Sequence, residues 1–230
     1  MSKRRMHAED RKLAIVRAAL PLFAKHGFAR TTTKDLAKAA GVSEPLLYKH
    51  FPSKEALYLE IQNFTCRDID PVVQKLNSLD PSTSTLVHLV FYLMRALVSG
   101  KPNGSINWDT RHRLMTQSFL ADGGFARLIY DTRFDCYCSR IEASLVEAVK
   151  AGDAVESPVP KANLARFSHH VGAWIALVHL PDRPSMNYKA KAAELLNQAV
   201  WFVLRGMGLK DQAIARHYNP KAIELFFNES

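Results

Sequence analysis

Residues 31–60 contain two short helical patterns separated by a glycine turn, and this stretch constrains the fold more than any other part of the chain. Thr32 or Thr33 is placed to cap the first helix, and the small apolar side chains that follow allow a close helix crossing. Gly41 is expected to end this helix because glycine adopts the left-handed conformation easily, and Ser43 is placed to cap the next one. The pattern predicts a helix-turn-helix that leads into a third, longer helix.

The second helix of this motif, residues 44–50, has one apolar and one polar face. Its apolar side chains, and Phe51 after it, are expected to pack inward. The side chains that remain on the outside are Glu44, Pro45, Tyr48, Lys49 and His50. A phenol, an amine and an imidazole can each donate to a phosphate oxygen, and residues near the helix N-terminus can reach base edges. The outward face therefore favours binding in the major groove of DNA.

The residues around this motif closely resemble the N-terminal domain of the TetR family of transcriptional repressors. The match spans residues 11–60, and its parts are Phe23, Gly27, Thr32–Thr33, Ala39–Ser43, Tyr48–Phe51 and Ser53–Leu57. The remaining three quarters of the chain carry no such signature. The resemblance implies an all-α fold, namely an N-terminal three-helix helix-turn-helix domain and a C-terminal helical domain for ligand binding and dimerisation.

The resemblance also assigns roles to single residues. It implies that Thr33, Ser43, Tyr48, Lys49, His50 and Lys54 contact the phosphate backbone or the groove, and that Glu44 and Pro45 lie closest to base edges. Glu44 has to accept a hydrogen bond from a cytosine amine or stay clear of the phosphates, because it is an acid. Pro45 has no donor and offers only an apolar contact, for example to a thymine methyl group.

The charge distribution agrees with a nucleic-acid partner. Residues 1–60 hold 12 Lys and Arg against 6 Asp and Glu, a net charge of +6, and the remainder holds 19 against 16, or +3 of the total +9. Basic charge concentrated on one domain is typical of nucleic-acid binders. The first ten residues include Lys3, Arg4 and Arg5, which predict either an arm along DNA or a disordered tail.

The chain divides into three expected parts. Residues 1–53 form the helix-turn-helix domain, residues 54–76 a connecting helix that Pro71 bends or breaks, and residues 77–230 the C-terminal domain. A first helix over residues 11–26 is expected to bend at Pro21 and to end at Gly27. In the C-terminal part we expect helices over residues 84–99, 107–121, 124–151, 161–180, 187–207 and 210–227, the last broken at Pro220.

Two C-terminal helices have the apolar spacing of self-associating helices. The residues concerned are Leu164, Phe167, Val171, Trp174 and Val178 in one helix and Leu195, Ala199 and Phe202 in the next. Such a pair, doubled by a two-fold axis, forms a four-helix bundle. The alternative is that both stripes face the core of the single chain. The family resemblance favours a homodimer, and two recognition helices reading a palindrome increase specificity.

The C-terminal helices are also rich in aromatic and methionine residues. An effector pocket among them would be lined by Phe91, Met94, Trp108, Arg111, Met115, Phe119, Phe134 and Trp174. Each of these residues taken alone is more typical of plain core. The resemblance implies a small apolar effector, and the alternative is a regulator without a small ligand that a protein partner or its own concentration controls.

Several other classes of protein are disfavoured. No apolar run reaches the ~20 residues of a membrane span, and the N-terminus lacks a signal-peptide core, so a cytoplasmic protein is expected. Three cysteines, Cys66, Cys136 and Cys138, do not form a disulfide framework. No phosphate loop, nucleophile elbow or metal-binding helix is present, so no cofactor and no catalytic activity are expected. Together with these motifs, the family resemblance implies a homodimeric repressor that a small molecule releases from a palindromic DNA operator.

Overall fold

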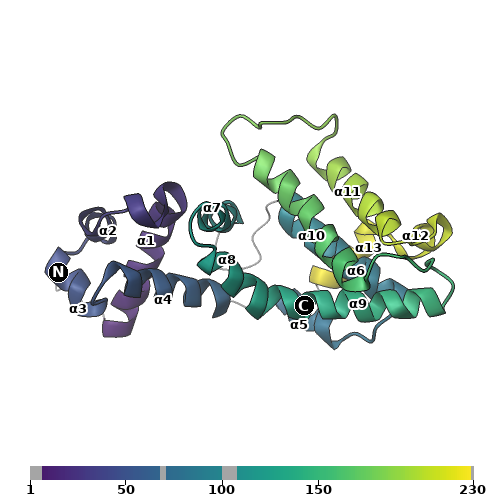
Figure 1. Ribbon diagram of the computed structural model, residues 1–230, viewed down its shortest axis with the longest axis horizontal. Coiled ribbons are helices and arrows are strands. Elements are labelled where there is room, and N and C mark those ends of the chain that lie inside the picture. Colours follow the sequence, from purple (N-terminus) through teal and green to yellow (C-terminus); the bar gives the residue numbers. More distant parts are fainter. Residues whose placement is uncertain (1–6, 68–70, 100–107, 229–230) are drawn as a thin grey trace. The chain divides into compact units, whose positions relative to one another are not determined.

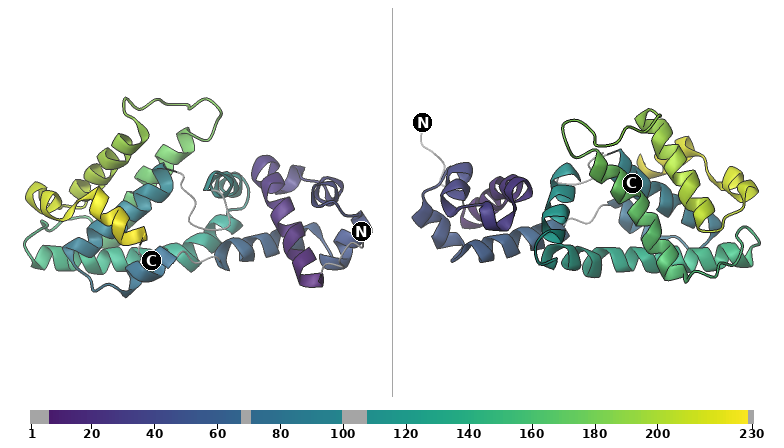
Figure 2. Two further views of the ribbon diagram at one scale, coloured as in Figure 1. Left: turned by 180° about the vertical axis from the view of Figure 1, so that it is seen from behind. Right: turned by 45° about the horizontal axis from the view of Figure 1, so that its top comes forward.

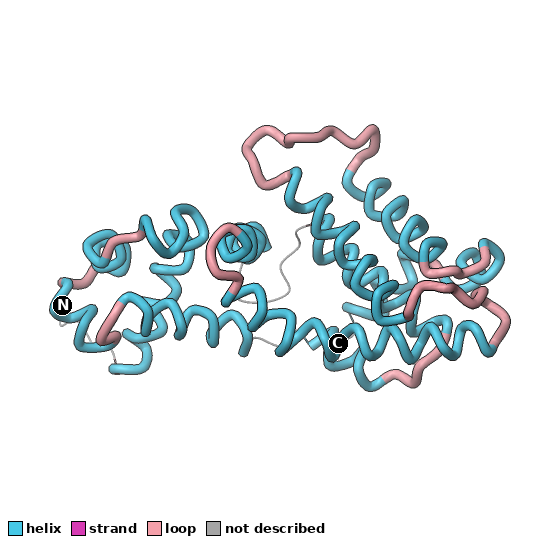
Figure 3. Tube along the Cα trace, in the orientation of Figure 1, coloured by secondary structure: helices cyan, strands magenta, loops and turns pink. Residues whose placement is uncertain are grey.

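The computed structural model describes residues 7–67, 71–99 and 108–228, and helices make up nearly all of its regular structure (Figures 1 and 3). Within these ranges the only strand-like pairing is an isolated bridge between Ala154 and Leu209. The predicted all-α fold is therefore confirmed. The basic residues of the predicted N-terminal arm, Lys3, Arg4 and Arg5, lie outside the described residues.

The chain forms two compact units that each combine separate segments. Unit 1 contains residues 1–68 and 109–130, and unit 2 contains residues 69–108 and 131–230. This division differs from the expected ranges, because residues 109–130 lie with the N-terminal helices. They do so because α8 packs on α4 and because the Gln117 side chain lies against Gly27.

Unit 1 is built from α1 (Ala8–Arg30), α2 (Thr33–Ala40), α3 (Glu44–His50), α4 (Lys54–Arg67), most of α7 (Trp108–Phe119) and α8 (Gly124–Ile129). Its core includes the fully buried Phe23, Leu36, Leu57 and Ile61. Phe28 and Tyr58 pack on Phe23, with ring centroids 6.1 and 5.0 Å from it. These contacts hold α4 against α1.

The first helix extends beyond its predicted range of 11–26 at both ends, and its backbone leaves the helical conformation at Gly27 (φ 73°, ψ 172°), where its end was expected. The backbone remains helical at Pro21, where a bend was expected. Pro21 is exposed. The conformation of Gly27 is one that residues with a side chain rarely adopt.

Unit 2 is arranged around α6 (Thr83–Val98). The other helices of this unit are α5 (Pro71–Ser78), α9 (Asp135–Lys150), α10 (Lys161–Val178), α11 (Ala192–Gly206), α12 (Asp211–His217) and α13 (Pro220–Asn228). The bounds of α6, α10 and α11 lie within five residues of the predicted ones, and Pro220 begins a new helix as predicted. The α6 helix contacts α5, α9, α10, α11, α12 and α13, and twelve of its sixteen residues are buried.

The segment 54–76 contains α4 and α5, and Pro71, where the connecting helix was expected to bend or break, is the first residue of α5. One predicted helix is divided. The segment 124–151 contains α8, a π-helical turn at Tyr130–Phe134 and then α9. Proline and the π-turn each interrupt the regular hydrogen-bond pattern of an α-helix.

Close packing in unit 2 depends on a small residue. Gly172 of α10 faces α6, and a Cβ atom there would lie 2.7 Å from Leu97 Cδ1 and 2.9 Å from Met94 Cε. Figures 1 and 2 show α10 running beside α11, and the two helices are in contact. None of the described helices combines the length and apolar character needed to cross a membrane.

Candidate nucleic-acid interface

The turn between α2 and α3 has the geometry that the sequence predicts. Gly41 takes the left-handed conformation (φ 65°, ψ 32°), and the amide of Val42 donates to the carbonyl of Ala37 at 3.0 Å. Thr32 caps α2, because its hydroxyl oxygen accepts from the amide of Asp35 at 3.2 Å. The same hydroxyl donates to the Asp35 carboxylate at 2.6 Å and lowers the pKa of that group. The start of α2 is thus fixed by side-chain hydrogen bonds.

The α3 helix presents the expected outward face. Ser43 caps it by accepting from the amide of Leu46 at 3.3 Å, and Pro45 lies in its first turn. Leu47 and Phe51 are each 3% exposed and fix the inner face. Pro45, Tyr48 and Lys49 are exposed, and Glu44 and His50 are partly exposed. The polar side chains of α3 are therefore accessible to a groove, as the sequence predicts.

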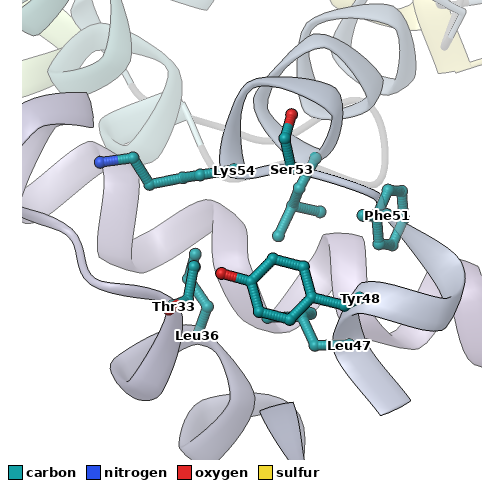
Figure 4. Close-up of a pocket in the computed structure, with 8 residues that line it drawn as sticks. Thr33, Leu36, Leu47, Tyr48, Phe51, Ser53 and Lys54 are labelled. Atoms are coloured by element: carbon teal, nitrogen blue, oxygen red, sulfur yellow. The ribbon is translucent and has the colours of Figure 1, made fainter. Parts of the chain in front are cut away.

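Tyr48 lies at the edge of a shallow hollow between α2, α3 and α4 (Figure 4). The residue is 44% exposed, and its hydroxyl points toward the side of the hollow that Thr33 forms. The lining residues are Thr33, Leu36, Leu47, Tyr48, Phe51, Ser53, Lys54 and Leu57. The apolar lining supports the tyrosine ring and leaves its hydroxyl at the surface.

Lys54 has a different environment from the one expected of a phosphate-binding lysine. Its Nζ donates to the carbonyls of Phe28 at 3.0 Å and Thr31 at 3.2 Å, and it lies 4.2 Å from the centroid of the Phe28 ring. These carbonyls lie at the end of α1, and the Phe28 carbonyl also accepts from the amide of Thr31 at 3.4 Å. Two of the three ammonium donors are thus used within the protein. Lys54 thus links α1 and α4, and its predicted contact with a DNA phosphate stays a prediction.

Thr33 and Glu44 are joined across the turn. The Thr33 hydroxyl donates to Glu44 Oε2 at 3.0 Å, and both residues are partly buried. No local pattern predicts this bond, because the two residues are eleven positions apart and belong to different helices. The pair connects the first turn of α2 with the first residue of α3.

Three lysine side chains of α2 and α3 are exposed. Lys34, Lys38 and Lys49 are exposed, and no ion pair between described residues involves Lys49. An amine that is not neutralised by a protein carboxylate can release counterions from DNA. Among the described residues no group of three or more His, Cys, Asp or Glu is arranged to hold a metal ion.

The residues expected to line an effector pocket are divided between the two units. Phe91, Met94, Trp108, Phe134 and Trp174 lie in unit 2, and Arg111, Met115 and Phe119 lie in unit 1. Phe91 and Met94 are 1% and 0% exposed within the core of unit 2. Phe119 and Trp174 are each 59% exposed, so these two side chains do not wall an enclosed cavity in the single chain.

The apolar residues of α10 and α11 that were expected to form the dimer interface fall into a buried group and an exposed group. Leu164, Val178, Leu195 and Ala199 are 5–8% exposed and pack in the core of the chain itself, and Val171 is partly buried against that core. Phe167, Trp174 and Phe202 are 55%, 59% and 68% exposed. The burial of the first group fits the alternative that these residues face the core of the single chain, because a regular apolar spacing serves core packing as well as association. The second group forms an exposed aromatic patch, defined here as Phe167, Trp174 and Phe202.

Comparison with known proteins agrees with this geometry. Residues 15–61 match the family model described as "Bacterial regulatory proteins, tetR family". The chain is 39% identical over 74 residues to the HTH-type transcriptional regulator EthR of Mycolicibacterium smegmatis, a match that covers 32% of this chain and 31% of EthR. It is 29% identical over 154 residues to the nucleoid occlusion factor SlmA of Salmonella dublin, a match that covers 65% of this chain and 71% of SlmA.

The fold also resembles that of solved structures. The crystal structure of AibR in complex with isovaleryl coenzyme A and operator DNA matches with a TM-score of 0.61 and 18% sequence identity. The match covers 84% of this chain and 97% of AibR. At this level of identity the comparison supports the arrangement of helices and not a shared ligand.

Proposed function

We propose that this chain, a member of the TetR family of DNA-binding transcriptional regulators, is a homodimeric repressor that a small molecule releases from a palindromic operator. The observation that carries the proposal is the exposed polar face of α3, presented outward by the Gly41 turn. In each half-site α3 lies in the major groove. Tyr48 and Lys49 bind phosphates, and Glu44 and Pro45 lie nearest the bases.

The homodimer is supported by the exposed aromatic patch. Large aromatic side chains that are more than half exposed on two neighbouring helices are unusual for a monomer surface and are typical of interface cores. A two-fold axis next to α10 and α11 would bury Phe167, Trp174 and Phe202 against their copies. The dimer then places two α3 helices to read one palindrome.

The effector is a small apolar molecule bound among the helices of unit 2, and AibR, which was crystallised with both isovaleryl coenzyme A and operator DNA, supports this kind of control. Release requires that the effector prefer the conformation that does not bind DNA. A tenfold loss of DNA affinity corresponds to ~1.4 kcal/mol of that preference. The alternative is control by a protein partner or by concentration, and the closed packing of Phe91 and Met94 favours it.

The first experiment is selection of bound duplexes from a random pool at a fixed, modest salt concentration. The proposal predicts an inverted repeat, and failure to retain any duplex would remove it. The Lys49→Ala variant should then bind all sequences more weakly, with a salt slope smaller by about 0.9 for each phosphate that it no longer binds. The exposed Lys150, in α9 of unit 2, provides the control, because Lys150→Ala should leave the slope unchanged.

The second experiment distinguishes the two modes of control. The intact protein, purified under gentle conditions, is measured by native mass spectrometry, and metabolites are screened for loss of operator binding. A retained small molecule or a releasing metabolite supports the effector. A protein that carries none, and that no small molecule releases from DNA, supports the alternative.

A further inference from the structure

The hydrogen bond between Thr33 and Glu44 commits the hydroxyl group of Thr33. A carboxylate has no proton to give, so the threonine must be the donor. A threonine hydroxyl has a single hydrogen, and the 3.0 Å bond to Glu44 Oε2 uses it. Thr33 therefore cannot donate to a DNA phosphate while this bond exists. A phosphate approaching Thr33 would also meet the negative charge of Glu44 beside it.

Ser43 and Thr32 differ from Thr33 in this respect. The Ser43 oxygen accepts from an amide, so its own hydrogen stays free for a phosphate. Thr32 bonds to Asp35 within α2 and so serves the start of that helix. Only Thr33, among these three hydroxyl residues, reaches from α2 to the helix that faces the groove.

Glu44 keeps one carboxylate oxygen for another partner. Thr33 bonds to Oε2, and no ion pair between described residues neutralises the Glu44 carboxylate. Glu44 is the first residue of α3 and is partly exposed, as expected of a side chain that reaches a base edge. A side chain held at one oxygen loses less rotamer freedom when its other oxygen binds.

The base edges in the major groove differ in what they offer a carboxylate. Cytosine presents the N4 amine as a donor, whereas guanine presents only acceptors there. Adenine presents its N6 amine beside the N7 acceptor, and thymine presents an acceptor and a methyl group. A carboxylate is repelled by acceptor atoms, so cytosine is the base that suits it best.

We infer that Thr33 is a positioning residue that aims the Glu44 carboxylate at the N4 amine of a cytosine, so that each half-site carries a C·G pair at this position. The inference rests on the proposed function, because it names the operator chemistry that the same face of α3 selects. Thr33 then acts on base choice through Glu44 and contributes no phosphate contact of its own.

The test compares base preferences selected from a random duplex pool at fixed salt by the wild-type protein and by four variants. Glu44→Gln should change the preference at one position from cytosine to adenine, because glutamine pairs with adenine N6 and N7. Glu44→Ala should abolish the preference there. Thr33→Val, which keeps the shape without the donor, should weaken the cytosine preference about fivefold. Thr33→Ser restores the donor and should restore the preference.

The outcomes separate the two proposals. A Thr33→Val protein that binds every sequence more weakly with its base preference intact would make Thr33 a phosphate contact and overturn the inference. An unchanged selection profile for Glu44→Gln and Glu44→Ala would also overturn it, while leaving the proposed function in place. A wild-type protein that selects no duplex would instead remove the proposed function itself. Thermal unfolding of each variant identifies any that has not folded. The Glu44 variants test the contact with cytosine, and the comparison of Thr33→Val with Thr33→Ser tests the positioning role of Thr33.

Discussion

Lys54 Nζ lies 3.0 Å from the carbonyl oxygen of Phe28 and 4.2 Å from the centroid of that residue's ring. One lysine thus satisfies carbonyls at the end of α1 and stacks on the aromatic side chain that packs on Tyr58 of α4. A cation placed at a helix C-terminus also interacts favourably with the helix dipole. The position of α2 relative to α4 depends in part on this side chain, because the segment it holds leads directly into α2.

Replacing Lys54 by methionine should therefore affect stability more than phosphate binding. The variant loses two charge-assisted hydrogen bonds, and the free energy of unfolding should fall by about 1–3 kcal/mol. Urea unfolding measures this loss, and Lys49→Ala is the matched control that should leave stability within about 0.5 kcal/mol. The role would be wrong if Lys54→Met kept its stability and instead reduced the salt slope of DNA binding by about one phosphate.

A charge in the exposed aromatic patch should prevent self-association. Phe167→Glu and Phe202→Glu each place a carboxylate where the dimer would bury an aromatic ring, and both should sediment as monomers. Leu225→Glu is the control, because Leu225 is 63% exposed on α13 and lies outside the patch. Intact dimers of the phenylalanine variants would exclude this surface as the interface.

The buried imidazole of His112 should make stability depend on pH. Burial lowers the pKa of His112 from 6.5 to about 4, so the folded protein holds it neutral. Between pH 6.5 and about 4 the imidazole of His112 is protonated in the unfolded chain but neutral in the folded protein. The contribution of His112 to the free energy of unfolding is therefore complete above pH 6.5 and is lost as the pH falls. The lost stability amounts to about 3 kcal/mol at most.

Comparison of wild type with His112→Asn isolates this contribution from those of other groups. Urea unfolding at pH 7 and pH 5 should show that the wild type loses more stability on acidification than the variant does. An equal loss in both proteins would mean that the imidazole is accessible to protons in the folded state.

Gly172 should not tolerate alanine. The added Cβ would meet Leu97 and Met94 at under 3 Å, and such overpacking costs about 1–3 kcal/mol. Gly206→Ala provides the control, since a Cβ at Gly206 meets no atom within 4 Å and alanine favours helices. The melting temperature should therefore fall for Gly172→Ala and should not fall for Gly206→Ala. Equal shifts of the melting temperature would show that α6 and α10 can move apart without loss of stability.

Features that depend on local sequence were predictable. The left-handed Gly41, the Ser43 cap and the burial of Leu47 and Phe51 all follow from the residues within one or two turns. A glycine at the end of a helix and a hydroxyl residue at the start of the next are typical of a left-handed turn and a helix cap. Once the apolar side chains of α3 are assigned to the core, its remaining side chains form the exposed face.

Features that depend on distant contacts were not predictable from spacing. Lys54 and Phe28 are 26 residues apart, and Thr33 and Glu44 are 11 apart on different helices. The same holds for α10, where an apolar repeat does not reveal which members face the core of their own chain. Leu164 and Val178 face it, whereas Phe167 and Trp174, only three or four residues away from them, do not.

The placement of residues 109–130 has a practical consequence for building chimeric proteins. The chain passes from one unit to the other at residues 68–69, 108–109 and 130–131, so the unit that carries α3 is not one continuous piece of sequence. In a chimera that exchanges residues 1–68 alone, α4 would pack against the α8 helix of the recipient protein. Gly27 of α1 would meet whichever residue the recipient has in place of Gln117. Transplanting this DNA specificity intact therefore requires exchanging two segments together.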